Sequence, residues 1–237
     1  MALPMNSTPI YNLTVPSTGQ EVKFRPFLIK EEKALLLAHQ SEDTKVMVDS
    51  LKSVIKECIK DPIDINALAT FDLEYVFTQI RAKSVGENVE LFLKCDTCTD
   101  EKAVAKVDID LTTIEVQRSP DHTNKIALFD DVGLLMKYPT VDLVKRLENI
   151  DNANLDQIFN VVVECIDSIY TTNEVFYAKD QTKAELLEFL NNLSSEQFKK
   201  VQEFFENMPK LKKDIKYTCP VCSKEHEKTL EGLNSFF

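Results

Sequence analysis

The sequence predicts an α+β protein: a mostly helical body with an N-terminal β arm and a split four-cysteine zinc ribbon carrying a helical insertion. Three observations lead to this fold class. Apolar residues recur at helical spacing over two long stretches, and they alternate with polar residues over several shorter ones. Two Cys-x-x-Cys motifs, 120 residues apart, each stand among the alternating stretches. A hydrophobic content of 43% is enough for a folded core.

The first predicted segment is an extended β arm over residues 1–29. Residues 11–15 and 21–25 alternate roughly between apolar and polar side chains around Pro16-Ser17-Thr18-Gly19. This pattern predicts a hairpin with a short turn, and Pro26 closes its second strand. The arm contains three prolines before Ser17, and it either frays or lies along a neighbouring subunit.

Residues 30–87 are predicted to form the helical body. Glu31 and Glu32 place negative charge at the start of a first helix, where the helix dipole favours it. A second helix is expected from about Thr44 to Lys60, because an apolar stripe recurs along it until Asp61-Pro62. A third helix is expected to run through Val76 and Ile80.

Two β-rich segments, 88–117 and 211–231, are predicted to be the halves of the ribbon, since both combine alternating residues with a Cys-x-x-Cys turn. Between them, 118–210 is predicted to be a helical insertion, and 232–237 a C-terminal tail. The expected insertion helices cover 141–147, 155–169, 184–193 and 195–208, and residues 126–132 are ambiguous between helix and strand.

The two motifs, CDTC and CPVC, predict a metal site made by Cys95, Cys98, Cys219 and Cys222. Two such turns facing each other place four thiolates at tetrahedral corners, the arrangement that one structural Zn²⁺ per chain accepts. Four cysteine ligands leave no open position for water, so the site is expected to be structural and not hydrolytic. His226 is an alternative ligand or a donor behind the ligands.

A redox dithiol is the competing interpretation of a single Cys-x-x-Cys motif. Two motifs among predicted strands favour a metal instead, and folding of the insertion can hold the distant halves together. Cys58 and Cys165 lie on apolar helical stripes and are expected to be buried core residues. The sequence contains no phosphate-binding glycine loop, HExxH or GxSxG motif, so no enzyme is predicted.

The formal net charge of −11 argues against nucleic-acid binding, which needs clustered Lys and Arg. A nucleic-acid-binding zinc-ribbon protein nevertheless remains the alternative function from another class. The N-terminal residues show no basic region followed by an apolar run, so we expect no signal peptide. No stretch is long and apolar enough to span a membrane, and a reducing cytoplasm is the expected site of synthesis.

Several stretches resemble the T4-like bacteriophage baseplate hub protein family. They are LTVPSTG at 13–19, FRPFLIKEEK at 24–33, VGL at 132–134 with KYPT at 137–140, and the closing GLNSFF at 232–237. The resemblance implies a non-enzymatic component of a contractile tail that binds other hub or tail proteins. It would be assembled in the host cytoplasm and located in the virion tail baseplate, either as a retained subunit or as an assembly factor.

Contact residues for such partners are expected at both ends of the chain. The candidates are aromatic or basic residues of the arm and the terminal pair of phenylalanines, because aromatic anchors are typical of interface hot spots. These candidates are Tyr11, Phe24, Arg25, Phe27, Phe236 and Phe237. The two terminal rings either fold back onto the ribbon or enter a partner's pocket.

Overall fold

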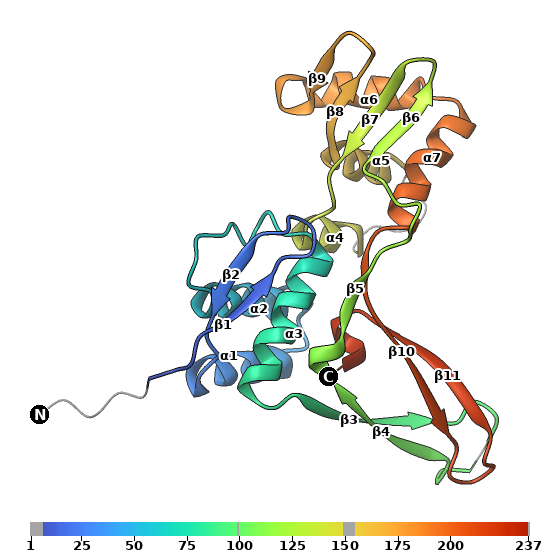
Figure 1. Cartoon of the computed structure of the whole chain (residues 1–237). Coiled ribbons are helices and arrows are strands. Elements are labelled where there is room, and N and C mark those ends of the chain that lie inside the picture. Colours follow the sequence, from blue (N-terminus) through green and yellow to red (C-terminus); the bar gives the residue numbers. More distant parts are fainter. Residues whose placement is uncertain (1–6, 99, 149–154, 237) are drawn as a thin grey trace, which may run out of the picture. The chain divides into compact units, whose positions relative to one another are not determined.

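The structure is a computed structural model that describes residues 7–98, 100–148 and 155–236 (Figure 1). It contains both helices and several small sheets, so the predicted α+β class is confirmed. The chain divides into two compact units. Unit 1 joins Met1–Gln117 to Lys210–Phe237, and unit 2 is Arg118–Pro209. Unit 2 thus corresponds to the stretch predicted as an insertion.

Unit 1 begins with an antiparallel hairpin of β1 (Tyr11–Thr14) and β2 (Glu21–Phe24). One face of this hairpin is buried in the core of the unit. The outer edge of β2 is also covered, because Lys60 N donates to Lys23 O at 2.8 Å and Arg25 N donates to Cys58 O at 3.0 Å. Residues 11–24 are therefore part of unit 1 and not a free arm. Residues 1–6, which the predicted arm includes, lie outside the described part of the chain.

Three helices follow the hairpin: α1 (Ile29–Gln40), α2 (Thr44–Cys58) and α3 (Thr70–Ser84). Asp43 caps α2, where its carboxylate accepts hydrogen bonds from the backbone N–H groups of Lys45 and Val46. Helix α3 is the central helix of the unit, with eight of its residues buried. Among the described residues, no helix combines the length and apolar character needed to cross a membrane.

The rest of unit 1 is built from two small antiparallel sheets. One is the hairpin β3–β4, and the other has the strand order β11-β10-β5. Their apolar faces share a core with α3, in which Leu111, Ile114 and Leu211 are fully buried. Gln117, at the end of β5, pairs with Lys210, at the start of β10, so the chain leaves for unit 2 and returns at neighbouring positions. The elements are β3 (Asn88–Lys94), β4 (Val104–Asp110), the 3₁₀ turn η1 (Leu111–Thr113), β5 (Glu115–Gln117), β10 (Lys210–Thr218), β11 (Glu225–Glu231) and the 3₁₀ turn η3 (Leu233–Phe236).

Unit 2 has its own core between a four-stranded antiparallel sheet, order β6-β7-β8-β9, and helices. The side chains of Leu134, Met136 and Ile166 from the sheet pack with Leu190 and Val201 from the helices. Helices α6 and α7 begin at capping boxes formed by Thr182 with Glu185 and by Ser194 with Gln197. The elements are β6 (Lys125–Phe129), β7 (Val132–Met136), α4 (Val141–Glu148), α5 (Leu155–Glu164), β8 (Ile166–Tyr170), β9 (Val175–Tyr177), the 3₁₀ turn η2 (Ala178–Asp180), α6 (Lys183–Asn191) and α7 (Ser195–Glu206).

The prediction of a helical insertion over 118–210 is wrong for the four-stranded sheet of unit 2. The stretch 126–132, left ambiguous, belongs to the hairpin β6–β7, in which burial alternates along Lys125–Phe129. The helix expected over 155–169 ends at Glu164, and Ile166–Tyr170 is strand β8. The apolar residues of this stretch fit both the helical and the strand period. Pairing with β7, which is distant in sequence, and with the adjacent strand β9 decides for the strand.

Gly133 on β7 is a position where the sheet of unit 2 tolerates no side chain. A Cβ atom added there would overlap the ring of Tyr170 and lie 2.5 Å from the carbonyl oxygen of Ile126. Gly133→Ala is therefore expected to destabilise unit 2 by about 1–3 kcal/mol, measured by denaturant unfolding. Adding Tyr170→Ala should recover part of the loss, since the ring overlap disappears and the backbone contact remains. An unchanged unfolding midpoint for Gly133→Ala would contradict this packing.

Candidate metal centre and predicted contact residues

The two Cys-x-x-Cys motifs lie at the tips of two hairpins. Cys95 follows β3, and its N–H donates to Ala103 O at 2.8 Å, one step beyond the last pair of the β3–β4 ladder. Cys219 follows β10 and occupies the equivalent place, donating to Lys224 O at 2.9 Å beside the last pair of β10–β11. Each second cysteine, Cys98 and Cys222, stands in the turn itself. The two hairpins thus present their cysteines in the same way.

The tips meet, and the four sulfur atoms lie within 4.8 Å of one another. The Cys98 and Cys219 Sγ atoms are 3.8 Å apart, and those of Cys95 and Cys222 are 3.9 Å apart. A tetrahedron with metal–sulfur bonds of about 2.3 Å has edges of about 3.8 Å. The spacing of these four thiols therefore fits a tetrahedral metal ion, and the residues could hold one.

Backbone amides support the negative charge that metal binding requires. Thr97 N donates to Cys95 Sγ at 3.4 Å, and Val221 N donates to Cys219 Sγ at the same distance. In each motif the amide belongs to the second residue after the first cysteine, so the two turns have matching geometry. Hydrogen bonds to a thiolate favour its charged form. The backbone is thus arranged for thiolate ligands.

The thiols also affect each other, since they stand too close for all four to ionise without a cation. A hydrogen bond with the Thr97 hydroxyl is the main cause that lowers the pKa of Cys95 to about 5. A hydrogen bond with Cys222 is the main cause that raises the pKa of Cys98 to about 12. The pKa of Cys222 is lowered, first by a hydrogen bond from the backbone of Lys224 and then by the one with Cys98. A bound divalent cation would remove this competition, because its charge favours the thiolate form of every ligand.

His226 stands behind the four sulfurs, where the sequence allowed either a ligand or a supporting donor. Its Nε2 atom is 3.2 Å from Cys95 Sγ, and its ring stacks on Tyr217 with centroids 5.1 Å apart. The Tyr217 hydroxyl in turn donates to Lys94 O at 3.1 Å, which connects β10 to β3. This chain of contacts orients Cys95, and the imidazole is not one of the four clustered sulfur groups.

Replacing His226 by alanine is expected to weaken metal binding about tenfold while leaving one metal ion per chain. The reason is that the imidazole orients Cys95 without adding a coordination bond. Competition with a chromophoric chelator would measure the affinity, and elemental analysis the stoichiometry. Lys228→Ala, an exposed change two residues along β11, is the matched control and should change neither quantity. Complete loss of the metal from His226→Ala would instead identify the histidine as a ligand.

The two remaining cysteines do not belong to the four-cysteine cluster. Cys58 is fully buried at the end of α2, and burial is the main cause that raises its pKa to about 11. Cys165 is fully buried in the core of unit 2, and burial raises its pKa to about 12. Both are neutral thiols at physiological pH. Cys165 lies in a hydrophobic core, whereas the Arg25 guanidinium is 3.9 Å from Cys58 Sγ.

The predicted contact residues of the arm are mostly buried in unit 1. Phe24 is 2% exposed, Arg25 7% and Phe27 9%, and Tyr11 is half-buried with its ring against Phe24. These exposures place the first three side chains in the interior, where a partner protein cannot contact them in the described structure. Phe237 and the side chain of Phe236 lie outside the described residues.

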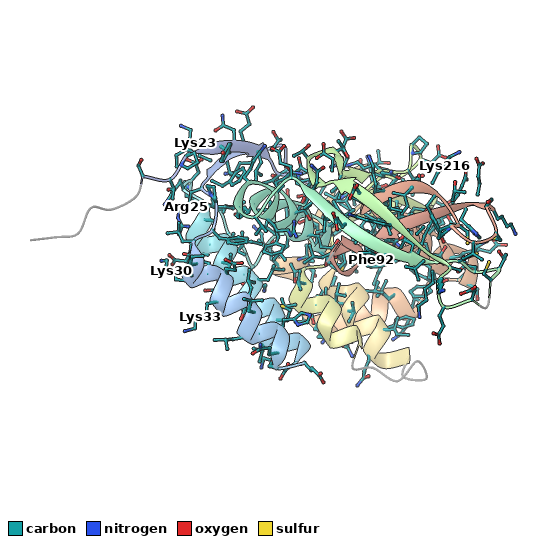
Figure 2. The ribbon with its side chains drawn as sticks, turned by 90° about the horizontal axis from the view of Figure 1, so that it is seen from below. Lys23, Arg25, Lys30, Lys33, Phe92 and Lys216 are labelled. Carbon is teal, nitrogen blue, oxygen red and sulfur yellow. The ribbon has the colours of Figure 1, made fainter. Side chains whose placement is uncertain are left out.

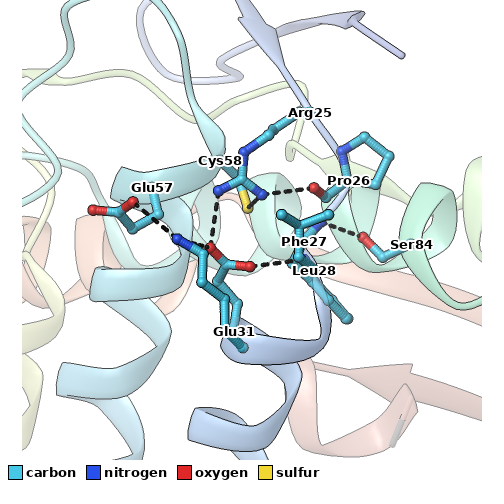
Figure 3. A network of polar contacts seen from close by, with 9 residues as sticks. Arg25, Pro26, Phe27, Leu28, Glu31, Glu57, Cys58 and Ser84 are labelled. Carbon is cyan, nitrogen blue, oxygen red and sulfur yellow. Dashed lines mark hydrogen bonds and ion pairs between the residues drawn. The ribbon is translucent and has the colours of Figure 1, made fainter. Parts of the chain in front are cut away.

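Arg25 has an internal role that the sequence analysis missed (Figure 3). Its guanidinium donates to Glu31 Oε1 at 2.9 Å and to the carbonyl oxygen of Pro26 at 2.9 Å. The other oxygen of Glu31 accepts the N–H of Leu28 at 2.8 Å, at the start of α1. Both charged side chains are buried. The sequence does contain a signal for this ion pair: a basic and an acidic residue stand six positions apart, on either side of Pro26, close to the start of a helix.

This environment holds Glu31 in its ionised form. Burial by itself would raise the pKa of the carboxyl group. Hydrogen bonds from Arg25, from the backbone of Leu28 and from Lys30 outweigh that effect and lower the pKa to about 2. The ion pair therefore fixes the beginning of α1 against the hairpin at every physiological pH.

Comparison with known protein families identifies the family of the chain. A family model described as T4 bacteriophage base plate protein matches residues 8–237, which include both cysteine motifs and all of unit 2. The searches of curated proteins and of solved structures found no significant match.

Proposed function

The chain belongs to the T4 bacteriophage base plate protein family, and from this premise we propose that it is a non-enzymatic component of the central baseplate hub. In this role it binds other hub or tail proteins, as a retained subunit or as an assembly factor. The observation that carries the proposal is the family match over nearly the whole chain.

A structural zinc ion is the second part of the proposal. The tetrahedral spacing of the four sulfurs and the matching amide contacts support zinc bound by Cys95, Cys98, Cys219 and Cys222. When bound, zinc supplies no reaction in a closed four-thiolate site, and it cross-links two hairpins. The residues of the chain supply the geometry: the two ladders position the cysteines, and His226 orients Cys95.

Binding of nucleic acid is not part of the proposal. The chain has 39 acidic and 28 basic residues, and the resulting net negative charge repels a polyanion. Salt-dependent binding of duplex DNA or of RNA by the zinc-loaded protein would revive the alternative of a nucleic-acid-binding ribbon.

Quantitative mass spectrometry of purified tails and of assembling lysates tests the proposed location. Stoichiometric amounts in intact tails are expected for a retained hub subunit. Presence in assembling lysates together with absence from finished tails is expected for an assembly factor that is released. Absence from both would refute a role in the baseplate.

A further inference from the structure

Helix α1 carries three of its four large aliphatic side chains on the side that faces solvent, and the fourth, Leu35, is half-buried. Ile29 is 77% exposed, Leu36 59% and Leu37 57%. Residues seven and eight positions apart lie on the same side of a helix, so these three form one surface with Lys33 between them. We call Ile29, Lys33, Leu36 and Leu37 the α1 stripe. Of the large hydrophobic residues in the described chain, Ile29 is the most exposed.

The inner side of the same helix carries one charged residue, Glu31, together with the apolar residues Leu35 and Ala38. Its buried residues are Glu31 and Ala38, and Glu31 forms the ion pair with Arg25. Helices at a protein surface normally bury their aliphatic face and expose their charges. Helix α1 departs from this pattern, because it exposes Leu36 and Leu37 while it buries Glu31 in the ion pair. Large aliphatic side chains exposed together on one side of a helix make that side a candidate interaction surface.

The charges around the stripe indicate what binds there. Figure 2 shows Lys30 and Lys33 projecting from α1. Lys30 lies 3.2 Å from Glu31 and 3.9 Å from Glu57. Within the described ranges, by contrast, no carboxylate forms an ion pair with the exposed Lys33. An occupant with acidic residues beside its apolar ones would complement both the leucines and this lysine.

A second copy of the chain complements the stripe poorly. Two α1 stripes facing each other would offer Lys33 no carboxylate, since the stripe contains none, and would bring together two chains of net charge −11. A different protein with an acidic amphipathic segment meets neither difficulty.

We propose that the α1 stripe is the docking surface for an amphipathic segment of another baseplate protein, with apolar side chains against Ile29, Leu36 and Leu37 and a carboxylate opposite Lys33. This inference rests on the proposed function, and it names the surface through which that function is exerted. The recognition mode is an apolar face packed against a helix, with charge setting the choice of partner.

Complementation of a phage that lacks its own copy of the chain tests the surface. The double variant Leu36→Asp with Leu37→Asp is expected to lower the yield of complete baseplates at least about tenfold. Lys33→Glu should lower the yield about fivefold or more. Lys228→Glu, the same charge reversal at an exposed position on β11, is the matched control and should leave the yield unchanged. All three variants should keep the melting temperature and metal content of the wild type, since these side chains are exposed.

A photo-cross-linking amino acid at position 36 identifies the occupant during assembly. The expected product joins the chain to a different tail protein, at a segment where apolar residues stand beside Asp or Glu. Changing one of those acidic residues to Lys should restore assembly with Lys33→Glu. Cross-links to a second copy, to lipid or to another part of the same chain would overturn the proposal.

Failure of this inference is distinguishable from failure of the proposed function. Normal baseplates with both stripe variants would refute docking on α1 while leaving the hub role intact. Normal baseplates in the complete absence of the chain would refute the hub role itself.

Discussion

Removing the metal is expected to cost unit 1 several kcal/mol of folding free energy and to leave the core of unit 2 in place. The two cysteine tips contribute only a small cluster of buried residues, Cys95, Ala103 and Cys219. Small hairpins of this kind are marginally stable without further support. Binding to four thiolates supplies that support, because the free energy of metal binding becomes folding free energy.

Cys222→Ser is the sharpest test of this expectation. Cys222 is exposed, so its replacement removes a ligand and few packing contacts. Elemental analysis should find about one zinc per wild-type chain and a strongly reduced content in the variant. The melting temperature of the variant should fall to that of the wild type treated with a chelator.

Val221→Ser is the matched control for the ligand substitution. Val221 is the neighbouring residue, is 47% exposed and keeps its backbone hydrogen bond to Cys219 after substitution. The free energy of unfolding of Val221→Ser should differ from that of the wild type by less than about 0.5 kcal/mol. Wild-type protein that is fully folded without metal and indifferent to chelator would refute the structural ion.

Glu31→Gln is expected to destabilise unit 1 by about 3–5 kcal/mol at pH 7. The substitution leaves the buried guanidinium of Arg25 without its counter-charge, and an uncompensated buried charge is the costly outcome. Denaturant unfolding would measure the loss. Glu32→Gln changes the neighbouring acidic residue, which is not the partner of Arg25 in this ion pair and is less buried. It should cost less than about 0.5 kcal/mol.

The pH dependence gives the same interaction a second signature. The pKa of Glu31 is about 2 in the folded chain, below its ordinary value of 4.5. The unfolded chain therefore takes up the proton first as pH falls, so the stabilisation is complete above about pH 5 and is lost as pH falls toward 2. The stability difference between wild type and Glu31→Gln should shrink over that interval. A difference that stays constant from pH 7 to pH 3 would contradict the ionised pair.

A double variant separates the ion pair from the packing around it. Replacing Arg25 by Met and Glu31 by Leu removes both charges and keeps most of the side-chain volume. Its stability should lie much closer to that of the wild type than Glu31→Gln does, because no charge remains buried alone. If the double variant were as unstable as the single one, the loss would come from packing and not from charge.

The cluster of four cysteines could be predicted from sequence because metal ligation requires a characteristic spacing of thiols. Two turns of the form Cys-x-x-Cys, each among alternating strands, have few structural uses, and hairpin registers then determine where the sulfurs lie. The class of fold followed from the same local patterns. Each of these sequence signals, taken singly, depends on residues that lie close together in the chain.

The missed features depend on residues that meet only in the folded chain. Arg25 was assigned to a partner because exposure cannot be read from a basic residue beside prolines, and its burial requires the ion pair with Glu31. Strand β8 was predicted as helix because the apolar run that continues from Val161 fits both periods. Only the neighbouring strands β7 and β9 resolve that ambiguity.

The pairing of Gln117 with Lys210 has a consequence for the order in which the chain folds. On the ribosome, Cys98 emerges 121 residues before Cys219, and 92 of these residues belong to unit 2. Once unit 2 has formed its own core, the effective loop between the two cysteines shortens to 29 residues. The entropic cost of closing that loop falls by about 1.3 kcal/mol. We therefore expect unit 2 to fold first and to bring the two halves of unit 1 together. The four-thiol centre is then expected to be the last part of the molecule to assemble.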